Sequence, residues 1–264
     1  MRLKGRIAIV VGAGQTPGDT IGIGRATAVA FAREGARVLL ADANLTSAEE
    51  TLQMIVAEGG DASCLRADVT REEDCRAIAD TCRERYGRID LLQYNVGIGA
   101  GDSIPTQLEV GNWDRILDTN LRGCFLTAKA VLPMMLEQRS GSIVNVSSIA
   151  AVVSLPIVAY KTSKAGLNAF TQSIAVTNAP FGVRANAVMP GLIETPLAIE
   201  GFAQATGRPK ADIIKERNAA VPLRQTMGSA WDVAWASVFL HSEEARFITG
   251  AILPVDGGQS ARIG

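Results

Sequence analysis

Short runs of β-branched and other apolar residues alternate with longer helical stretches along almost the whole chain. The predicted strands are Ile7–Val11, Arg37–Ala41, Ala62–Arg66, Leu91–Tyr94, Ser142–Val146, Arg184–Val188 and Ala251–Pro254. The predicted helices are Gly24–Glu34, Leu45–Glu58, Arg71–Tyr86, Trp113–Gln138, Ala159–Asn178 and Trp231–Leu240. Strands that are apolar throughout need cover on both faces, and crossovers between parallel strands are right-handed. We therefore expect a single α/β domain over residues 1–264, a doubly wound parallel sheet of about seven strands with helices on both faces.

The composition argues against several classes of function. The chain has 26 basic and 27 acidic residues, so its formal charge of −1 gives no general attraction to nucleic acid or anionic membrane. No apolar run approaches the ~20 residues that span a bilayer. The four cysteines have no Cys-x-x-Cys spacing, and the lone His241 has no partner for a metal site. We therefore expect a cytoplasmic protein that binds no metal, nucleic acid or membrane.

A glycine-rich segment joins the first predicted strand to the first predicted helix; its glycines are Gly12, Gly14, Gly18, Gly22 and Gly24. Glycines at such a turn let the backbone approach a pyrophosphate, whose charge then lies at the helix N-terminus. Asp42 ends the second strand, where a carboxylate can accept hydrogen bonds from an adenosine ribose and would repel a 2′-phosphate. No Gly-Lys-Ser/Thr ends the segment, which argues against an ATPase phosphate loop. These features predict a site for NAD.

Tyr160 and Lys164 are four residues apart, so they share one face of a predicted helix. A cation near a phenol favours the phenolate and lowers the tyrosine pKa from its ordinary value of ~10. The phenol then becomes a usable proton carrier. Ser147 and Ser148 lie a dozen residues upstream, where a hydroxyl could hold a substrate oxygen. The pattern predicts proton transfer at an alcohol or a carbonyl.

With these motifs in this order, the chain resembles the short-chain dehydrogenase/reductase family over nearly its whole length. The resemblance implies a catalytic set, which is Asn120, Ser148, Tyr160 and Lys164. It also implies cofactor-binding residues, which are Gly12, Gly22, Ile23, Gly24, Asp42, Asp68, Val69, Asn95, Gly97, Tyr160, Lys164, Pro190, Gly191, Ile193 and Thr195. Members of the family are commonly tetramers built on two long helices, so the resemblance also implies a homotetramer.

The glycine-rich segment departs from the family pattern by about six extra residues. Gly18–Gly24 also fits the family's glycine spacing by itself, but Gly12 directly follows the strand and is favoured as the first glycine. The insertion Gln15–Ile21 is then expected to bulge outward. Asp19 should point away from the pyrophosphate, because like charges repel.

Two further departures lie nearer the predicted catalytic residues. Tyr94 replaces a small amide and Gln93 an aliphatic residue, which alters the local support of the sheet. The interval from the serine pair to Tyr160 is one residue shorter than is common, which leaves a choice between Ser147 and Ser148. Alignment of the strand that precedes them favours Ser148.

The resemblance implies hydride transfer between nicotinamide and a secondary alcohol or ketone, with Tyr160 as the acid/base. The predicted substrate contacts are Ser148, Ser154, Leu155, Ile98 and Leu197, and a lid is predicted at about residues 192–227. The lid's cations, Arg208, Lys210, Lys215 and Arg217, are expected on a solvated face. The substrate is therefore expected to be uncharged, and could be cyclic, a sugar or an aromatic diol.

Two other functions compete with this prediction. Enoyl reductases resemble this chain but typically space tyrosine and lysine more widely. A non-enzymatic dinucleotide-binding sensor or scaffold would keep the fold. It would not need the set of four catalytic residues that the resemblance implies.

Overall fold

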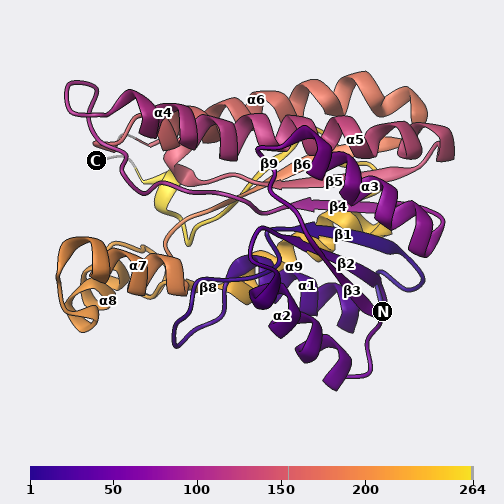
Figure 1. Cartoon of the computed structure of the whole chain (residues 1–264). Helices are drawn as coiled ribbons and strands as arrows, with labels where there is room; N and C mark the ends of the chain where they lie inside the picture. Colours follow the sequence, from indigo (N-terminus) through magenta and orange to yellow (C-terminus); the bar gives the residue numbers. More distant parts are fainter. Residues whose placement is uncertain (154, 263–264) are drawn as a thin grey trace.

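The computed structural model describes residues 1–153 and 155–262, which fold around a seven-stranded parallel sheet (Figure 1). The strands are β1 (Ile7–Val11), β2 (Arg37–Asp42), β3 (Ala62–Arg66), β4 (Leu91–Tyr94), β5 (Gly141–Val146), β6 (Val183–Pro190) and β9 (Ile252–Val255). Their order is β3-β2-β1-β4-β5-β6-β9, so the chain winds outward in both directions from the junction of β1 and β4. The predicted doubly wound sheet is confirmed.

Helices cover both faces of the sheet, as the apolar strands require. One face carries α1 (Ile23–Arg33), α2 (Leu45–Ala57) and α9 (Ala230–His241); the other carries α3 (Glu72–Tyr86), α5 (Gly123–Gln138) and α6 (Ala159–Asn178) (Figure 1). Side chains of β1 alternate between the two cores: Ile7, Ile9 and Val11 join one cluster, and Ala8 and Val10 join the other. Among the described residues, no helix combines the length and apolar character needed to cross a bilayer.

One predicted helix is divided in the structure. The stretch predicted as Trp113–Gln138 comprises α4 (Val110–Leu117), a π-helical segment (Asp118–Arg122) and α5. A π-turn places one extra residue in a helical turn, which apolar periodicity cannot reveal, and such turns are frequent at functional sites. The other predicted helices and the predicted strands agree with the structure to within two residues at each end. Single-turn 3₁₀ helices occupy Ile149–Ala151, Ala179–Phe181, Glu243–Ala245 and Gln259–Ala261.

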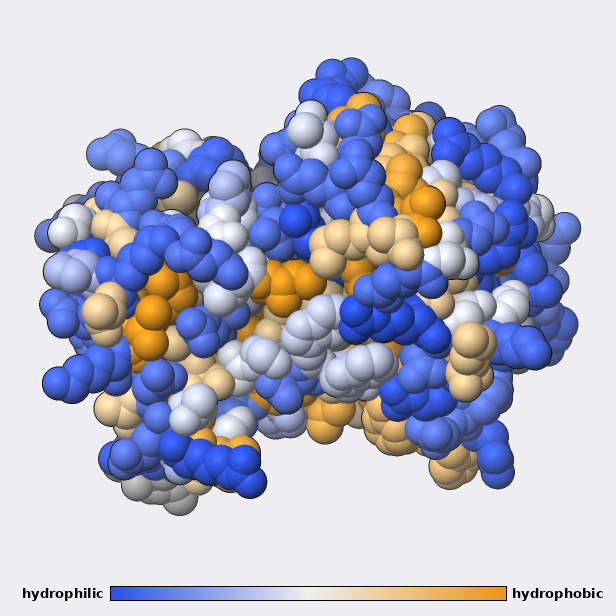
Figure 2. All heavy atoms as spheres, turned by 90° about the horizontal axis from the view of Figure 1, so that it is seen from below, coloured by the Kyte–Doolittle hydropathy of each residue, from blue (hydrophilic) through white to orange (hydrophobic). Residues whose placement is uncertain are grey.

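The segment predicted to form a lid contains its own regular structure. It comprises β7 (Ile193–Glu194), α7 (Pro196–Thr206) and α8 (Lys210–Ala219), and β7 pairs with β8 (Gly228–Ser229). These strands are two residues long, too short to give a sequence pattern. Residues of the segment form a small separate core, which is Ile199, Ile213, Val221 and Met227. The two helices stand apart from the main body, and apolar side chains are exposed between this lobe and the body (Figures 1 and 2).

The unusual residues of β4 are both fully buried. The Tyr94 hydroxyl donates to the Thr119 carbonyl at 2.7 Å, and a Cβ on Gly123 would lie 2.8 Å from that hydroxyl. Glycine at 123 therefore leaves the space that the tyrosine ring occupies. The side-chain amide of Gln93 has no hydrogen-bond partner among the described residues, and such burial costs about 1–3 kcal/mol. The centre of the sheet thus includes a polar group that destabilises it.

Candidate active site

A cavity of about 1400 Å³ opens at the carboxyl ends of the central strands, next to the lid helices. Ligands of doubly wound sheets bind at this edge, where the strand order reverses. Every predicted cofactor-binding residue lines the cavity. So do Ser148, Ile98, Leu155 and Leu197, whereas Asn120 does not. Ser154 lies outside the described residues.

The glycine turn brings the start of α1 against the end of β1. Gly12 has a φ of +79°, a conformation that favours glycine. A Cβ on Gly24 would lie 1.8 Å from the Gly12 carbonyl oxygen, so only glycine permits this approach. The N-terminus of α1 therefore borders the cavity, where its free N–H groups can bind an anion. Asn95 lines the same region, and its buried Oδ1 has no partner among the described residues. These features fit a dinucleotide.

The insertion Gln15–Ile21 reaches outward to the lid. The Gln15 Oε1 accepts from the Gly22 N–H at 2.8 Å, which closes the base of the loop. Asp19 is highly exposed, and its carboxylate accepts from the Lys210 ammonium at 3.1 Å. The Asp19 N–H donates to Glu200 at 3.1 Å, and Lys210 also donates to Glu200 at 3.1 Å. The insertion bulges outward as expected, and it also contacts both lid helices, which the sequence did not indicate.

Asp42 holds the glycine turn as well as facing the cavity. Its Oδ2 accepts from the Gly14 N–H at 2.8 Å, and its Oδ1 accepts from the Asn44 N–H at 2.9 Å. At the next strand end, hydrogen bonds from Thr70 lower the pKa of Asp68 below its ordinary value. Two carboxylates thus border the part of the cavity where the resemblance places adenosine.

Ser148 and Tyr160 face one another in the cavity. Burial raises the pKa of Tyr160, and a hydrogen bond with the Ser148 hydroxyl opposes this rise. The Ser148 Oγ also accepts from the Ala150 N–H at 3.1 Å. Ser147 is buried instead, and its hydroxyl donates to the Lys164 carbonyl at 3.3 Å. Of the two serines, Ser148 is therefore the one placed beside the phenol.

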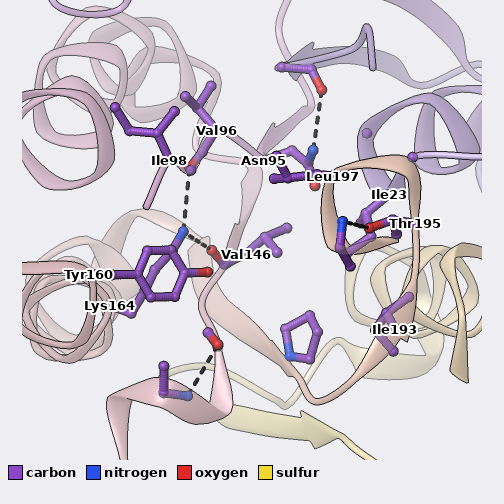
Figure 3. Close-up of a pocket in the computed structure, with 18 of the residues that line it drawn as sticks. Ile23, Asn95, Val96, Ile98, Val146, Tyr160, Lys164, Ile193, Thr195 and Leu197 are labelled. Carbon is purple, nitrogen blue, oxygen red and sulfur yellow. Dashed lines mark hydrogen bonds between the residues drawn. The ribbon is translucent and has the colours of Figure 1, made fainter. Parts of the chain in front are cut away.

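Lys164 is almost completely buried beside the tyrosine (Figure 3). Its ammonium donates to the Val146 carbonyl at 2.8 Å and to the Val96 carbonyl at 3.4 Å. Burial lowers the pKa of Lys164 to about 8. A Cβ on Gly97 would lie 2.9 Å from the ammonium nitrogen, so glycine leaves room for it.

The expected electrostatic effect of Lys164 on Tyr160 does not appear in the structure. The ammonium nitrogen lies 5.7 Å from the centroid of the tyrosine ring and is bonded to backbone carbonyls. Desolvation is the largest influence on the phenol, and the pKa of Tyr160 is raised rather than lowered.

Asn120 connects the loop after β4 to α6. Its Oδ1 accepts from the Ile98 N–H at 2.8 Å, and its Nδ2 donates to the Ile98 carbonyl at 2.9 Å and to the Ser163 hydroxyl at 3.0 Å. Ser163 in turn donates to the Tyr160 carbonyl at 2.7 Å. The amide is thus occupied by protein groups and positions the first turn of α6.

Asp102 is a site residue that the sequence did not reveal. Its carboxylate accepts from the N–H groups of Val158 and Ala159 at 3.1 Å and of Tyr160 at 2.7 Å. Helix caps are usually recognised because the capping residue directly precedes the helix. Asp102 lies 58 residues before Tyr160, so no local pattern marks it.

The lid cations do not all lie on a solvated face, which corrects that expectation. Arg208 pairs with Glu216 at 2.5 Å, and Lys210 pairs with Asp19 and Glu200. Arg217 instead lines the cavity, and its shielded Nε has no partner among the described residues. An uncharged substrate was expected because no arginine was predicted to face the pocket. Since Arg217 lines the cavity, that expectation loses its basis. No group of three His, Cys, Asp or Glu side chains suited to a metal ion occurs in the part of the chain described.

The chain is similar to known proteins over almost its whole length. Residues 18–260 match a family model described as enoyl-(acyl carrier protein) reductase. The chain is 34% identical to glucose 1-dehydrogenase 2 of Bacillus subtilis (strain 168), with 98% of this chain and 96% of that protein covered. It is 37% identical to cis-4-hydroxycyclohexanecarboxylate dehydrogenase of Sinomonas cyclohexanicum, with 97% of each covered. The structure of levodione reductase is similar, with a TM-score of 0.93 at 31% identity, over 99% of this chain and 100% of that one.

We expect Asp102→Ala to lower the free energy of unfolding by about 0.5–2 kcal/mol, because the first turn of α6 loses its acceptors. Asp102→Asn should lose less, since its amide oxygen still accepts one or two of these bonds. Urea denaturation measures both. Asp114→Ala, at an exposed position of α4, is the matched control, and an equal loss in that variant would contradict the capping role.

Proposed function

We propose, since the chain belongs to the short-chain dehydrogenase/reductase family, that it is an NAD(H)-dependent oxidoreductase that interconverts a secondary alcohol and a ketone. One observation carries this proposal. Ser148, Tyr160 and Lys164 converge on the same cavity that the glycine turn and Asp42 border. The proposed proton carrier and the proposed dinucleotide site thus share one cavity. When bound, the cofactor supplies hydride transfer at its nicotinamide and, in its oxidised form, a positive charge near the phenol.

Each residue of the chain has a distinct role in this proposal. The Ser148 hydroxyl donates to the substrate oxygen, and its own oxygen is held by the Ala150 N–H. Tyr160 takes the proton from that oxygen when the alcohol is oxidised and returns it when the ketone is reduced. Lys164 has two N–H groups on backbone carbonyls, which leaves its third for a ribose hydroxyl. Asn120 and Asp102 position the helix that carries the phenol.

The cofactor is proposed to be NAD rather than NADP because Asp42 is an acid at the end of β2. Its carboxylate also orders the glycine turn through the Gly14 N–H. A 2′-phosphate beside this carboxylate would meet like charge in a partly enclosed site.

The reacting part of the substrate is proposed to be a secondary alcohol or ketone on a carbon skeleton that is mainly apolar. Ile98, Leu155 and Leu197 line the cavity, and Leu155 and Leu197 lie at its exposed rim. One relative is named for a cyclic hydroxy acid, which supports a cyclic substrate here. An enoyl reductase is less well supported, because Tyr160 and Lys164 are only four residues apart. A sensor or scaffold would not need the contact between Ser148 and Tyr160.

We expect Tyr160→Phe to lower kcat by about 10²–10⁴-fold and to leave NAD+ affinity almost unchanged, because only the proton carrier is removed. The assay follows NADH formation with a panel of secondary alcohols, sugars, diols and hydroxycyclohexane carboxylates, and calorimetry measures NAD+ binding. Tyr86→Phe is the matched control, since Tyr86 bonds Ser63 outside the cavity. Near-wild-type turnover in Tyr160→Phe would refute the assignment.

We expect Asp42→Asn to raise the NADP+/NAD+ ratio of kcat/KM by about tenfold or more, because it removes the charge that repels a 2′-phosphate. The asparagine oxygen can still accept from the Gly14 N–H, so the turn should be preserved. Asp61→Asn removes the same charge from an exposed position that pairs with Arg37. A similar ratio in all three proteins would show that Asp42 does not discriminate.

We further propose a homotetramer assembled through α5 and α6, which lie side by side (Figure 1). Phe125 on α5 is 47% exposed and touches Phe170, and Val176 on α6 is 74% exposed. Light scattering should give four times the 27.8 kDa of one chain. Phe125→Asp should lower this mass, whereas Val56→Asp on α2 should not; a monomeric wild type would overturn the proposal.

A further inference from the structure

We propose that Arg217 is an anion subsite, so that the substrate carries a carboxylate at the end remote from its reacting hydroxyl. The proposal rests on the proposed function and makes its substrate class more specific. The lid helix α8 forms part of the cavity wall. In this proposal that part of the wall recognises the substrate, and Ser148 and Tyr160 carry out the proton transfer elsewhere in the cavity.

The guanidinium of Arg217 is partly buried and lines the cavity. Its Nε is shielded from solvent and has no acceptor among the described residues. Nearly all buried donors in proteins have a partner, and an arginine donor is permanently cationic. Burial lowers the pKa of Arg217, and the Glu216 carboxylate opposes this shift. A partly buried cation at the wall of a ligand cavity indicates that the ligand supplies a negative charge there.

Neighbouring cations form ion pairs within the protein, whereas Arg217 has only an electrostatic interaction with the adjacent Glu216. Arg208 pairs with Glu216, and Lys210 pairs with Asp19 and Glu200. Glu216 also lines the cavity, but its charge is balanced by Arg208. Arg262 is the other arginine at the cavity wall, and it too has an interaction within the chain.

Apolar residues of the same cavity indicate the rest of the ligand's chemistry. Leu155, Leu197 and Phe202 line the same cavity and offer no charge. A cation beside an apolar wall attracts an anion more strongly than it would in water. One guanidinium fits a single carboxylate, which it can bind through two parallel hydrogen bonds. The favoured substrate is therefore a hydroxy acid whose apolar skeleton separates the hydroxyl from the carboxylate.

A phosphate of the cofactor is the competing partner for Arg217. The glycine turn and the N-terminus of α1 already provide a place for the pyrophosphate, and they belong to the sheet body rather than to the lid. We therefore assign Arg217 to the substrate and make the cofactor an outcome of the test.

The experiment compares a hydroxycyclohexane carboxylate with its uncharged carboxamide. Calorimetry measures the binding of each probe to the NADH-loaded protein, and kcat/KM is measured with NAD+. Wild type should bind and oxidise the carboxylate at least tenfold better, or about 1.4 kcal/mol. Arg217→Gln should remove this preference and leave the carboxamide and NADH affinities within about twofold. Arg217→Lys should restore part of the preference for the carboxylate. Lys215→Gln, on the exposed side of α8, should not change the binding of either probe.

Equal binding of the two probes to wild type would overturn the proposal, and this comparison needs no variant. A preference that survives in Arg217→Gln would also overturn it. An equal loss of NADH affinity in that variant would assign Arg217 to the cofactor. If wild type oxidises uncharged alcohols but ignores the carboxylate, the subsite is wrong and the proposed function stands. If the carboxylate binds through Arg217 and nothing is oxidised, the subsite stands and the proposed function is wrong.

Discussion

Helices cover both faces of the parallel sheet, so the carboxyl ends of its strands are where the protein can gather polar side chains without burying them in an apolar core. At this edge Asp42 ends β2, Asn95 follows β4 and Ser148 follows β5. The close contact of Gly24 with the Gly12 carbonyl brings the start of α1 to the same edge. The position of the cavity follows from the topology of the sheet.

Burial shifts the pKa values of Tyr160 and Lys164, the two titratable groups of the proposed proton transfer, in opposite directions. It raises the pKa of Tyr160 and lowers the pKa of Lys164 to about 8, so both charged forms are disfavoured. The Ser148 hydroxyl is the group that opposes this effect at the phenol. A further positive charge in the cavity would favour the phenolate, so we infer that ionisation of Tyr160 is linked to ligand binding.

One exposed ion pair, Asp19 with Lys210, and a hydrogen bond from the Asp19 N–H to Glu200 join the extended glycine loop to the lid. Such pairs contribute about 0–1 kcal/mol each, so the contact of Asp19 with Lys210 and Glu200 adds little to global stability. The lid has its own small core around Ile199 and Ile213. It can therefore keep its internal structure while presenting Arg217 to the cavity.

The sequence by itself determined the fold and the motifs that line the cavity. The alternation of apolar strands and helices is local, and so are the glycine spacing and the separation of Tyr160 from Lys164. Such patterns can be recognised from neighbouring residues, without knowledge of distant contacts. They predicted the sheet and the residues now found around the cavity, and the proposed roles of those residues remain predictions.

Only the tertiary structure decided which groups meet across the chain. It turned Ser148 rather than Ser147 toward Tyr160, and it brought Asp102 to the start of α6 across 58 residues. It also left the Nε of Arg217 without a hydrogen-bond partner among the described residues, while Arg208 and Lys210 form ion pairs. The direction in which the pKa of Tyr160 shifts likewise depends on the burial of the phenol and on its distance from Lys164. Desolvation and long-range hydrogen bonds depend on three-dimensional packing, and sequence spacing does not encode them.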